Sequence, residues 1–308
     1  MMKVFLIVLS LFGFALLPLK PARAASALDK FHYVFIAGYK NEEIPGYFTE
    51  NIRFLRDLGA SSVSEIRPSS ETAVLNNVAL IRRELARLSE FENGKRPLLI
   101  IAHSKGGLES LHTLLRYPEQ FTKARVALLV VVQSPLMGSP YTDHVMNEWD
   151  TSIYAWTPAY WYFRNQHQGF LSMMTETVKA DWAASAAKVR SDQLAELSSR
   201  VLYLRSRKRF EEVSPSLKKS GGIVSLYGDN DGLVPTDHML LPRLGDLTPF
   251  GLDGGVEDGI DHLDGFALGA EPSPERIETV QKFTCRVLVK ALHVLNDAPE
   301  ECAVFNER

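Results

Sequence analysis

Ser104 stands where a serine hydroxyl could act as a nucleophile. The apolar run 98–102 ends at His103-Ser104, two glycines follow at 106 and 107, and leucines then recur at helical spacing over 108–115. This pattern predicts a buried strand, a sharp turn and a helix, with Ser104 at the apex of the turn. Small residues two positions on either side of the serine would let strand and helix approach closely. A helix that begins there also aims backbone N–H groups at the reacting atoms.

The segment 102–107, Ala-His-Ser-Lys-Gly-Gly, resembles the nucleophile elbow of α/β-hydrolase-fold lipases and esterases, usually written Gly-x-Ser-x-Gly. Alanine replaces the first glycine, a variant that these families tolerate. The resemblance implies a mainly parallel sheet flanked by helices, and a Ser-His-Asp triad that needs no cofactor or metal. The simpler alternative is an ordinary strand-to-helix turn with a capping serine.

Asp231 is the candidate acid of such a triad. A serine needs a base and the base needs an orienting carboxylate, which in this fold follow the serine in the order acid, then histidine. The segment 226–235, Leu-Tyr-Gly-Asp-Asn-Asp-Gly-Leu-Val-Pro, resembles the lipase acid loop, whose aspartate directly precedes Gly-x-Val-Pro. That position is Asp231. Asp229 is the alternative, although an aspartate in a turn is more often structural.

His262 is the candidate base among eight histidines. It lies between the last predicted strand and the terminal helix, where these hydrolases carry their histidine. The other seven fall inside predicted elements, in the inserted segment or directly after the acid loop: His32, His103, His112, His144, His167, His238 and His293. We expect His103 to pack under the serine. The simpler alternative for His262 is a surface histidine between two carboxylates.

Two backbone N–H groups are candidate donors to the oxyanion of a tetrahedral intermediate. One belongs to Lys105, which follows the nucleophile. The other belongs to Tyr39, which follows Ala37-Gly38 at the end of a predicted strand, where the family often has His-Gly-aromatic. Alanine at position 37 departs from that pattern. A second lipase-like segment, Gln-Ser-Pro-Leu-Met-Gly-Ser-Pro at 133–140, is expected to border the cleft.

The elements that must hold these residues alternate between strand and helix, which predicts a mainly parallel sheet with helices on both faces. Predicted strands cover 31–36, 63–66, 98–103, 126–132, 201–204 and 223–227. Predicted helices cover 47–58, a long segment that Ser69 or Ser70 caps and Gly94 ends, and the elbow helix, which runs to Tyr117-Pro118. A final predicted helix starts at Pro274 after Ser273.

The segment 141–200 interrupts this alternation and contains all four tryptophans, at 149, 156, 161 and 182. It is predicted to be a helical cap inserted over the strand ends. Its aromatic side chains could line an acyl-binding groove or contact lipid, or they could form the cap's own small core.

Composition limits the classes of function. The chain has 308 residues, 45% hydrophobic and 23% charged, and a net charge of −3, so it can build a sizeable core but offers no basic surface for nucleic acid. Residues 1–24 resemble a signal peptide, with Lys3, an apolar run and Ala22-Arg23-Ala24 before a cleavage site; an uncleaved anchor is the alternative. We therefore expect one domain over 25–308 in an exported, periplasmic or secreted protein.

The two cysteines, Cys285 and Cys302, are expected to form a disulfide in an oxidising compartment, the alternative being two free thiols. Together these features predict an exported serine hydrolase of carboxylic esters, with acyl lipids as substrates and transient contact with a lipid interface through the cap. The alternatives are an acyltransferase or thioesterase on the same fold, or a non-catalytic lipid-binding homologue.

Overall fold

The computed structural model describes residues 27–91, 95–119, 125–152, 155, 157–266, 272–297 and 302. The predicted signal peptide at 1–24 lies outside these residues, as do Tyr154 and Trp156 of the predicted cap.

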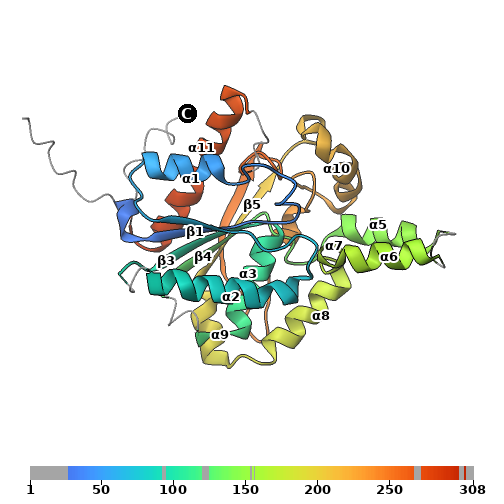
Figure 1. Cartoon of the computed structure of the whole chain (residues 1–308), viewed down its shortest axis with the longest axis horizontal. Helices are drawn as coiled ribbons and strands as arrows, with labels where there is room; N and C mark the ends of the chain where they lie inside the picture. Colours follow the sequence, from blue (N-terminus) through green and yellow to red (C-terminus); the bar gives the residue numbers. More distant parts are fainter. Residues whose placement is uncertain are drawn as a thin grey trace, which may run out of the picture.

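Six strands form one parallel sheet in the order β2-β1-β3-β4-β5-β6 (Figure 1). Their bounds are β1 His32–Ile36, β2 Val63–Ile66, β3 Leu98–His103, β4 Val126–Val132, β5 Val201–Arg207 and β6 Leu252–Asp258. Because parallel neighbours need long crossover connections, helices separate most of the strands along the chain. The parallel sheet predicted from the alternation of elements is confirmed.

Helices cover both faces of the sheet. They are α1 Thr49–Asp57, α2 Val74–Phe91, α3 Lys105–Arg116, α5 Pro140–Asp150, α6 Pro158–Gln166, α7 Gln168–Leu171, α8 Thr175–Ala186, α9 Ser191–Ser198, α10 Lys218–Val224 and α11 Pro274–Val294. Short 3-10 turns lie at Ala27–Lys30, Phe210–Glu212, Pro215–Leu217, Ser225–Tyr227 and Thr236–Met239. No helix in the described part of the chain is long and apolar enough to cross a membrane.

The central strands are buried on both faces. Alternate side chains of β3 enter two different apolar clusters, Ile100 with α2 and α3, and Ile101 with α1 and α11. Figure 1 shows α1 and α11 on one side of the sheet and α2, α3, α8 and α9 on the other. This double burial explains why β3 and β4 appear in the sequence as continuous apolar runs rather than as alternating patterns.

The segment 141–200 divides into two parts. Helices α5 to α7 contribute side chains to the cavity that contains Ser104. Helices α8 and α9 instead bury Val178, Trp182, Leu194 and Leu197 in the cluster formed with α2, α3 and the sheet. Part of the segment therefore completes the layer of helices on one face of the sheet.

Helix α2 begins later than the sequence predicts, so the expected cap by Ser69 or Ser70 is wrong. The first helical residue is Val74, and its N–H donates to Ser172 Oγ at 3.1 Å. Ser70 is used differently, because its hydroxyl binds the Glu42 carboxylate. A residue 98 positions away thus supplies the capping oxygen, which no local motif can indicate.

The strand predicted at 223–227 is also wrong. These residues end α10 and form a 3-10 turn, and Leu226 and Tyr227 are exposed. A short apolar run does not distinguish helix from strand. The sheet position beside β5 is taken by β6, whose sequence Leu-Asp-Gly-Gly-Val-Glu-Asp is too polar and glycine-rich to predict a strand.

The C-terminal end of the fold is held by α11 and a disulfide. Ser273 caps α11 by accepting from the Arg276 N–H at 3.3 Å, and Pro274 takes the first helical position, as predicted. Cys285 on α11 is bonded to Cys302, so the predicted disulfide is present.

His112 joins α3 to α8 and gives a testable pH dependence of stability. Its ring stacks on Trp182 with centroids 3.8 Å apart, and Nδ1 lies 3.1 Å from Ser185 Oγ. Burial lowers the pKa of His112 to about 3. The unfolded chain therefore gains a proton near pH 6.5 that the folded chain does not gain until about pH 3, and stability is lost as the pH falls between these values.

We expect His112→Leu to remove about 1.4 kcal/mol per pH unit from the slope of the unfolding free energy between pH 5.5 and 4. Urea denaturation at several pH values measures this slope. Ser185→Ala is the matched control, because it removes the contact to the ring but keeps the titrating group, and should leave the slope unchanged. Equal slopes in His112→Leu and the parent would contradict the assignment.

Candidate active site

Ser104 occupies a strained turn between β3 and α3. Its φ of 54° and ψ of −130° lie in a region that residues with a side chain rarely adopt. Two backbone contacts hold the turn, from the Ser104 N–H to the Val132 carbonyl at 2.9 Å and from the Gly107 N–H to the Ser104 carbonyl at 3.0 Å. Ser134 Oγ also donates to the Ser104 carbonyl at 2.6 Å. The hydroxyl is thus presented at the C-terminal edge of the central strands.

The two glycines after the serine are required by close packing. A Cβ at position 106 would lie 2.5 Å from the carbonyl oxygen of Ala37, and one at position 107 would lie 2.0 Å from Ser134 Oγ. The start of α3 therefore lies so close to the residues that follow β1 and β4 that no side chain fits at position 106 or 107.

We expect Gly106→Ala to lower the free energy of unfolding by about 1–3 kcal/mol, the usual cost of forcing an extra carbon into a packed site. The clash is with backbone, which cannot rotate away. Gly222→Ala in α10 is the control, because a Cβ there finds its nearest neighbour at 3.9 Å and alanine favours helix. Urea denaturation of both variants is the measurement, and equal behaviour would contradict the packing argument.

His262 lies between the serine and a carboxylate. Its Nε2 is 2.9 Å from Ser104 Oγ, and its Nδ1 is 2.7 Å from Asp231 Oδ2. An ionised carboxylate can only accept, so Nδ1 donates to Asp231 and Nε2 is left to accept the serine proton. The three side chains are nearly or fully buried. This arrangement can withdraw a proton from Ser104 and hold it on the imidazole.

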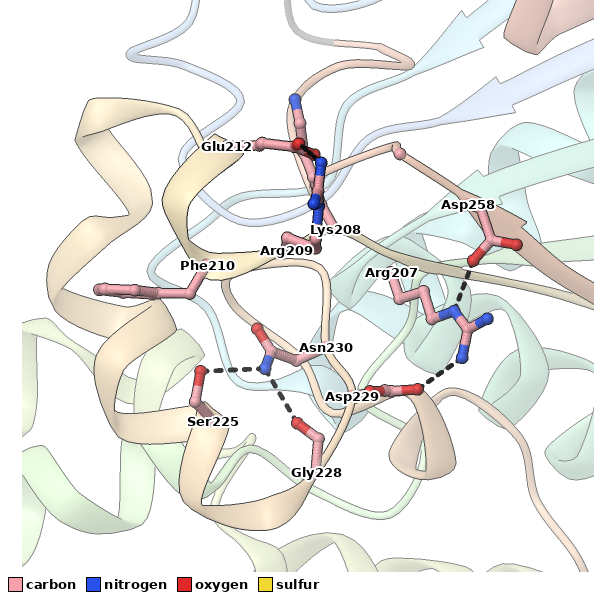
Figure 2. Close-up of a pocket in the computed structure, with 11 residues that line it drawn as sticks. Arg207, Lys208, Arg209, Phe210, Glu212, Ser225, Gly228, Asp229, Asn230 and Asp258 are labelled. Carbon is pink, nitrogen blue, oxygen red and sulfur yellow. Dashed lines mark hydrogen bonds and ion pairs between the residues drawn. The ribbon is translucent and has the colours of Figure 1, made fainter.

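Of the two candidate aspartates, Asp231 is the one that contacts His262. Its Oδ1 accepts the N–H groups of Leu233 and Val234 at 3.0 and 2.8 Å, which fixes the carboxylate and leaves Oδ2 for the histidine. Asp229 points away and pairs with Arg207 at 2.6 Å in a separate polar pocket of about 490 Å³, where Asp258 binds the same guanidinium (Figure 2).

His103 packs under Ser104, as predicted, and against the His262 ring, and its imidazole is kept in the neutral form. Burial lowers the pKa of His103 well below its usual value, and the neighbouring His262 ring, 4.8 Å away between centroids, adds to the effect. Its Nε2 faces the Gln133 Oε1 acceptor at 3.1 Å, so the neutral ring uses Nδ1 to accept from Tyr47 Oη at 2.6 Å. Burial raises the pKa of Tyr47, which keeps its proton available for this contact.

Asp261 and Gln133 support the loop that carries His262, although neither was predicted from the sequence to be a site residue. Buried Asp261 accepts from the N–H groups of Ser214 and Leu263, both at 2.9 Å. Burial alone would raise the pKa of Asp261, but a hydrogen bond from the Ser214 hydroxyl, the two N–H bonds and the Lys208 charge hold it below its usual value. Gln133 Nε2 donates to the Asp261 carbonyl at 3.0 Å. The only sequence signals were the carboxylate beside His262 and the lipase-like segment that begins at Gln133.

The two segments that carry the candidate oxyanion donors both lie against Ser104. A Cβ at Gly38 would lie 2.8 Å from Ser104 Cβ, so Tyr39 follows a backbone in direct contact with the serine. Lys105 is the first residue of α3, where helix N–H groups have no intrahelical acceptor. His262, Ser104 and Tyr39 line the same cavity.

That cavity has a volume of about 510 Å³ and mainly apolar walls. Helices α5, α6 and α7 contribute Tyr141, Val145, Phe163 and Phe170. Trp149 stacks on Phe163 with centroids 4.3 Å apart, while Trp182 packs in the core and Trp161 is exposed. The aromatic residues that were predicted to cluster therefore serve different purposes, since some line the cavity, one packs in the core and one is exposed.

Among the described residues, no group of three or more His, Cys, Asp or Glu side chains is arranged to hold a metal ion.

Comparisons with known proteins identify the fold. No protein-family model and no curated protein matches the chain. A metagenomic carboxyl esterase, MGS0156, superposes with a TM-score of 0.63 at 19% identity, covering 91% of this chain and 80% of the esterase. The mature Bacillus licheniformis lipase BlEst2 gives 0.55 at 18% identity over 76% of this chain and 85% of the lipase. Lipase 1 from Pelosinus fermentans gives 0.55 at 11% identity, over 83% and 98%.

These superpositions agree with the parallel sheet and with the helices on both of its faces. The chain has the α/β-hydrolase fold, which it shares with these carboxylesterases and lipases.

Proposed function

We propose that this protein is a serine hydrolase that cleaves carboxylic esters. The observation that carries the proposal is the unbroken chain of contacts from Ser104 through His262 to Asp231, opening into an apolar cavity. The esterases and lipases among the structures of similar fold support the same reaction class.

In the proposed mechanism Ser104 Oγ attacks the ester carbonyl while His262 Nε2 takes its proton. Asp231 keeps the imidazole in the tautomer that can accept, and stabilises its positive charge. The N–H groups of Tyr39 and Lys105 bind the oxyanion. His262 then returns the proton to the leaving alcohol, and a water activated by the same histidine hydrolyses the acyl-enzyme. None of these steps needs a cofactor.

We further propose acyl lipids as the substrate class. An ester whose acyl chain is apolar would bury that chain against the walls of the cavity, with the carbonyl at Ser104. On α6, Trp161 and Tyr162 are 59% and 68% exposed although their neighbour Phe163 lines the cavity. Such aromatic side chains suit a water–lipid boundary, which supports transient contact with aggregated substrate.

Export is proposed on the signal-like segment 1–24 and is consistent with the Cys285–Cys302 disulfide, since disulfides persist in oxidising compartments. The folded protein would then be one domain over 25–308 that acts in the periplasm or outside the cell.

A series of p-nitrophenyl esters of increasing chain length, assayed below and above micelle formation, tests the proposal. We expect turnover throughout, with kcat/KM rising with chain length and again when micelles form. Hydrolysis of short soluble esters alone would keep the hydrolase and exclude the lipid substrate. Absence of turnover with every ester would contradict the hydrolase itself.

A further inference from the structure

The residue after the nucleophile carries a buried charge that ester hydrolysis itself does not require. The side chain of Lys105 is only 1% exposed. Because a lysine is rarely buried unless it is paired, its partners should explain why it lies there. Its ammonium has three acceptors, Glu109 Oε1 at 2.6 Å and the carbonyls of Ser69 and Thr72 at 3.2 and 2.8 Å. All three of its N–H donors are therefore satisfied.

Glu109 completes the arrangement one turn along α3. It is also 1% exposed, and Asn77 Nδ2 donates to the same Oε1 at 2.6 Å. Burial raises the pKa of Glu109 to about 7, against the opposing effects of Lys105 and Asn77. A buried ion pair can often be replaced by apolar side chains without loss of stability, so stability alone does not account for it.

The pair holds in place the connection between β2 and α2, residues 67–73, which we call the β2–α2 loop. The ammonium binds two of its carbonyls, and Asn77 Nδ2 donates to the Ser69 carbonyl at 2.8 Å. These contacts fix the loop to the first turn of α3, directly beside the serine.

The same loop holds the segment that carries the other candidate oxyanion donor. Asn41 is fully buried, and its Nδ2 donates to the Gly38 carbonyl at 2.9 Å and to the Pro68 carbonyl at 2.7 Å. The Asn41 N–H donates to Ser70 Oγ at 3.1 Å. Tyr39 Oη donates to Glu71 Oε1 at 3.3 Å. The β2–α2 loop therefore lies between Lys105 on one side and residues 38–41 on the other.

We propose that Lys105 and Glu109 are positioning residues that set the distance between the two oxyanion donors by holding the β2–α2 loop against the nucleophile elbow. This inference rests on the proposed ester hydrolysis. Neither side chain touches the substrate; each acts through the loop on the Tyr39 and Lys105 N–H groups.

The test is the double variant Lys105→Met/Glu109→Met, which removes both charges and leaves no uncompensated ion in the core. Misplacement of a donor by about 1 Å can cost about a hundredfold in rate. We expect kcat on a p-nitrophenyl ester to fall between about tenfold and a hundredfold, with KM changed less than about threefold. Thr113→Val is the control for a general weakening of α3, because Thr113 is buried on the same helix and its hydroxyl donates to the Glu109 backbone carbonyl at 2.8 Å.

A second measurement separates positioning from loss of folding. A trifluoromethyl ketone with the acyl chain of the substrate forms a tetrahedral adduct with an oxyanion, whereas the matching methyl carbinol binds the cavity without one. The double variant should lose affinity for the ketone by the same factor as kcat and keep its affinity for the carbinol. A structural defect would weaken both ligands together.

The outcomes distinguish this inference from the proposed function. A parent protein without turnover and without ketone binding would overturn the hydrolase and this inference together. An active parent whose double variant keeps kcat within about twofold, or loses affinity for ketone and carbinol equally, would overturn the positioning role alone.

Discussion

Ser104→Ala is expected to lower kcat on carboxylic esters by about 10⁶-fold, as removal of the nucleophile does in characterised serine hydrolases. The variant lacks the oxygen that attacks the carbonyl, whereas the turn that holds residue 104 depends on backbone contacts and on Ser134. The protein should therefore remain folded, with a circular dichroism spectrum and a urea midpoint close to those of the parent.

Ser110→Ala controls for a generic effect of losing a hydroxyl from this helix. Ser110 is buried in α3 and donates only to the Gly106 carbonyl of its own helix among the described contacts. Its kcat should stay within about threefold of the parent. A comparable loss of rate in both variants, or a Ser104→Ala protein that still turns over at more than a few per cent of the parent rate, would contradict the assignment.

Asp231→Asn is expected to lower kcat by about 10⁴-fold, the effect of the equivalent change in a Ser-His-Asp triad. The asparagine oxygen can still accept from the Leu233 and Val234 N–H groups, which leaves its NH₂ facing His262 Nδ1. An NH₂ donor favours the tautomer with the proton on Nε2, and that nitrogen can no longer accept from Ser104.

The matched control is Asp229→Asn, two residues earlier in the same loop. Asp229 is exposed and binds Arg207, so its loss should change kcat less than about twofold. Steady-state kinetics of the two variants in parallel is the measurement. A larger loss in Asp229→Asn than in Asp231→Asn would reverse the assignment of the acid.

Much of the fold could be predicted because its signals are local. The apolar runs of β3 and β4 reflect burial on both faces, and Ser273-Pro274 marks the start of α11. Conversely, β6 is a polar edge strand, and 223–227 is an apolar run that forms helix. The strand β6 could not be predicted, because its pairing with β5 rather than the intrinsic preference of its residues makes it a strand. The helix at 223–227 could not be predicted, because a short apolar run is compatible with either helix or strand.

Some residues of the candidate site could likewise be predicted from the sequence and others could not. The sequence places Ser104, Asp231 and His262 in order but leaves Asp229 as an alternative, since a two-residue difference in a loop cannot reveal which carboxylate points at the imidazole. The Lys105–Glu109 pair was not foreseen as a unit. The proposed positioning role of this pair depends on the carbonyls of Ser69 and Thr72. These are more than 30 positions from Lys105 and become its neighbours only when α2 and α3 pack together.

The central claim is that the Ser104 hydroxyl is activated in the folded protein by its contact with His262. A fluorophosphonate probe reacts with activated serines, and peptide mass spectrometry locates the adduct. We predict one adduct per chain on Ser104, formed in the parent, abolished in Ser104→Ala and slowed by orders of magnitude in His262→Gln. A folded parent without an adduct, or with an adduct on a different serine, would contradict the claim.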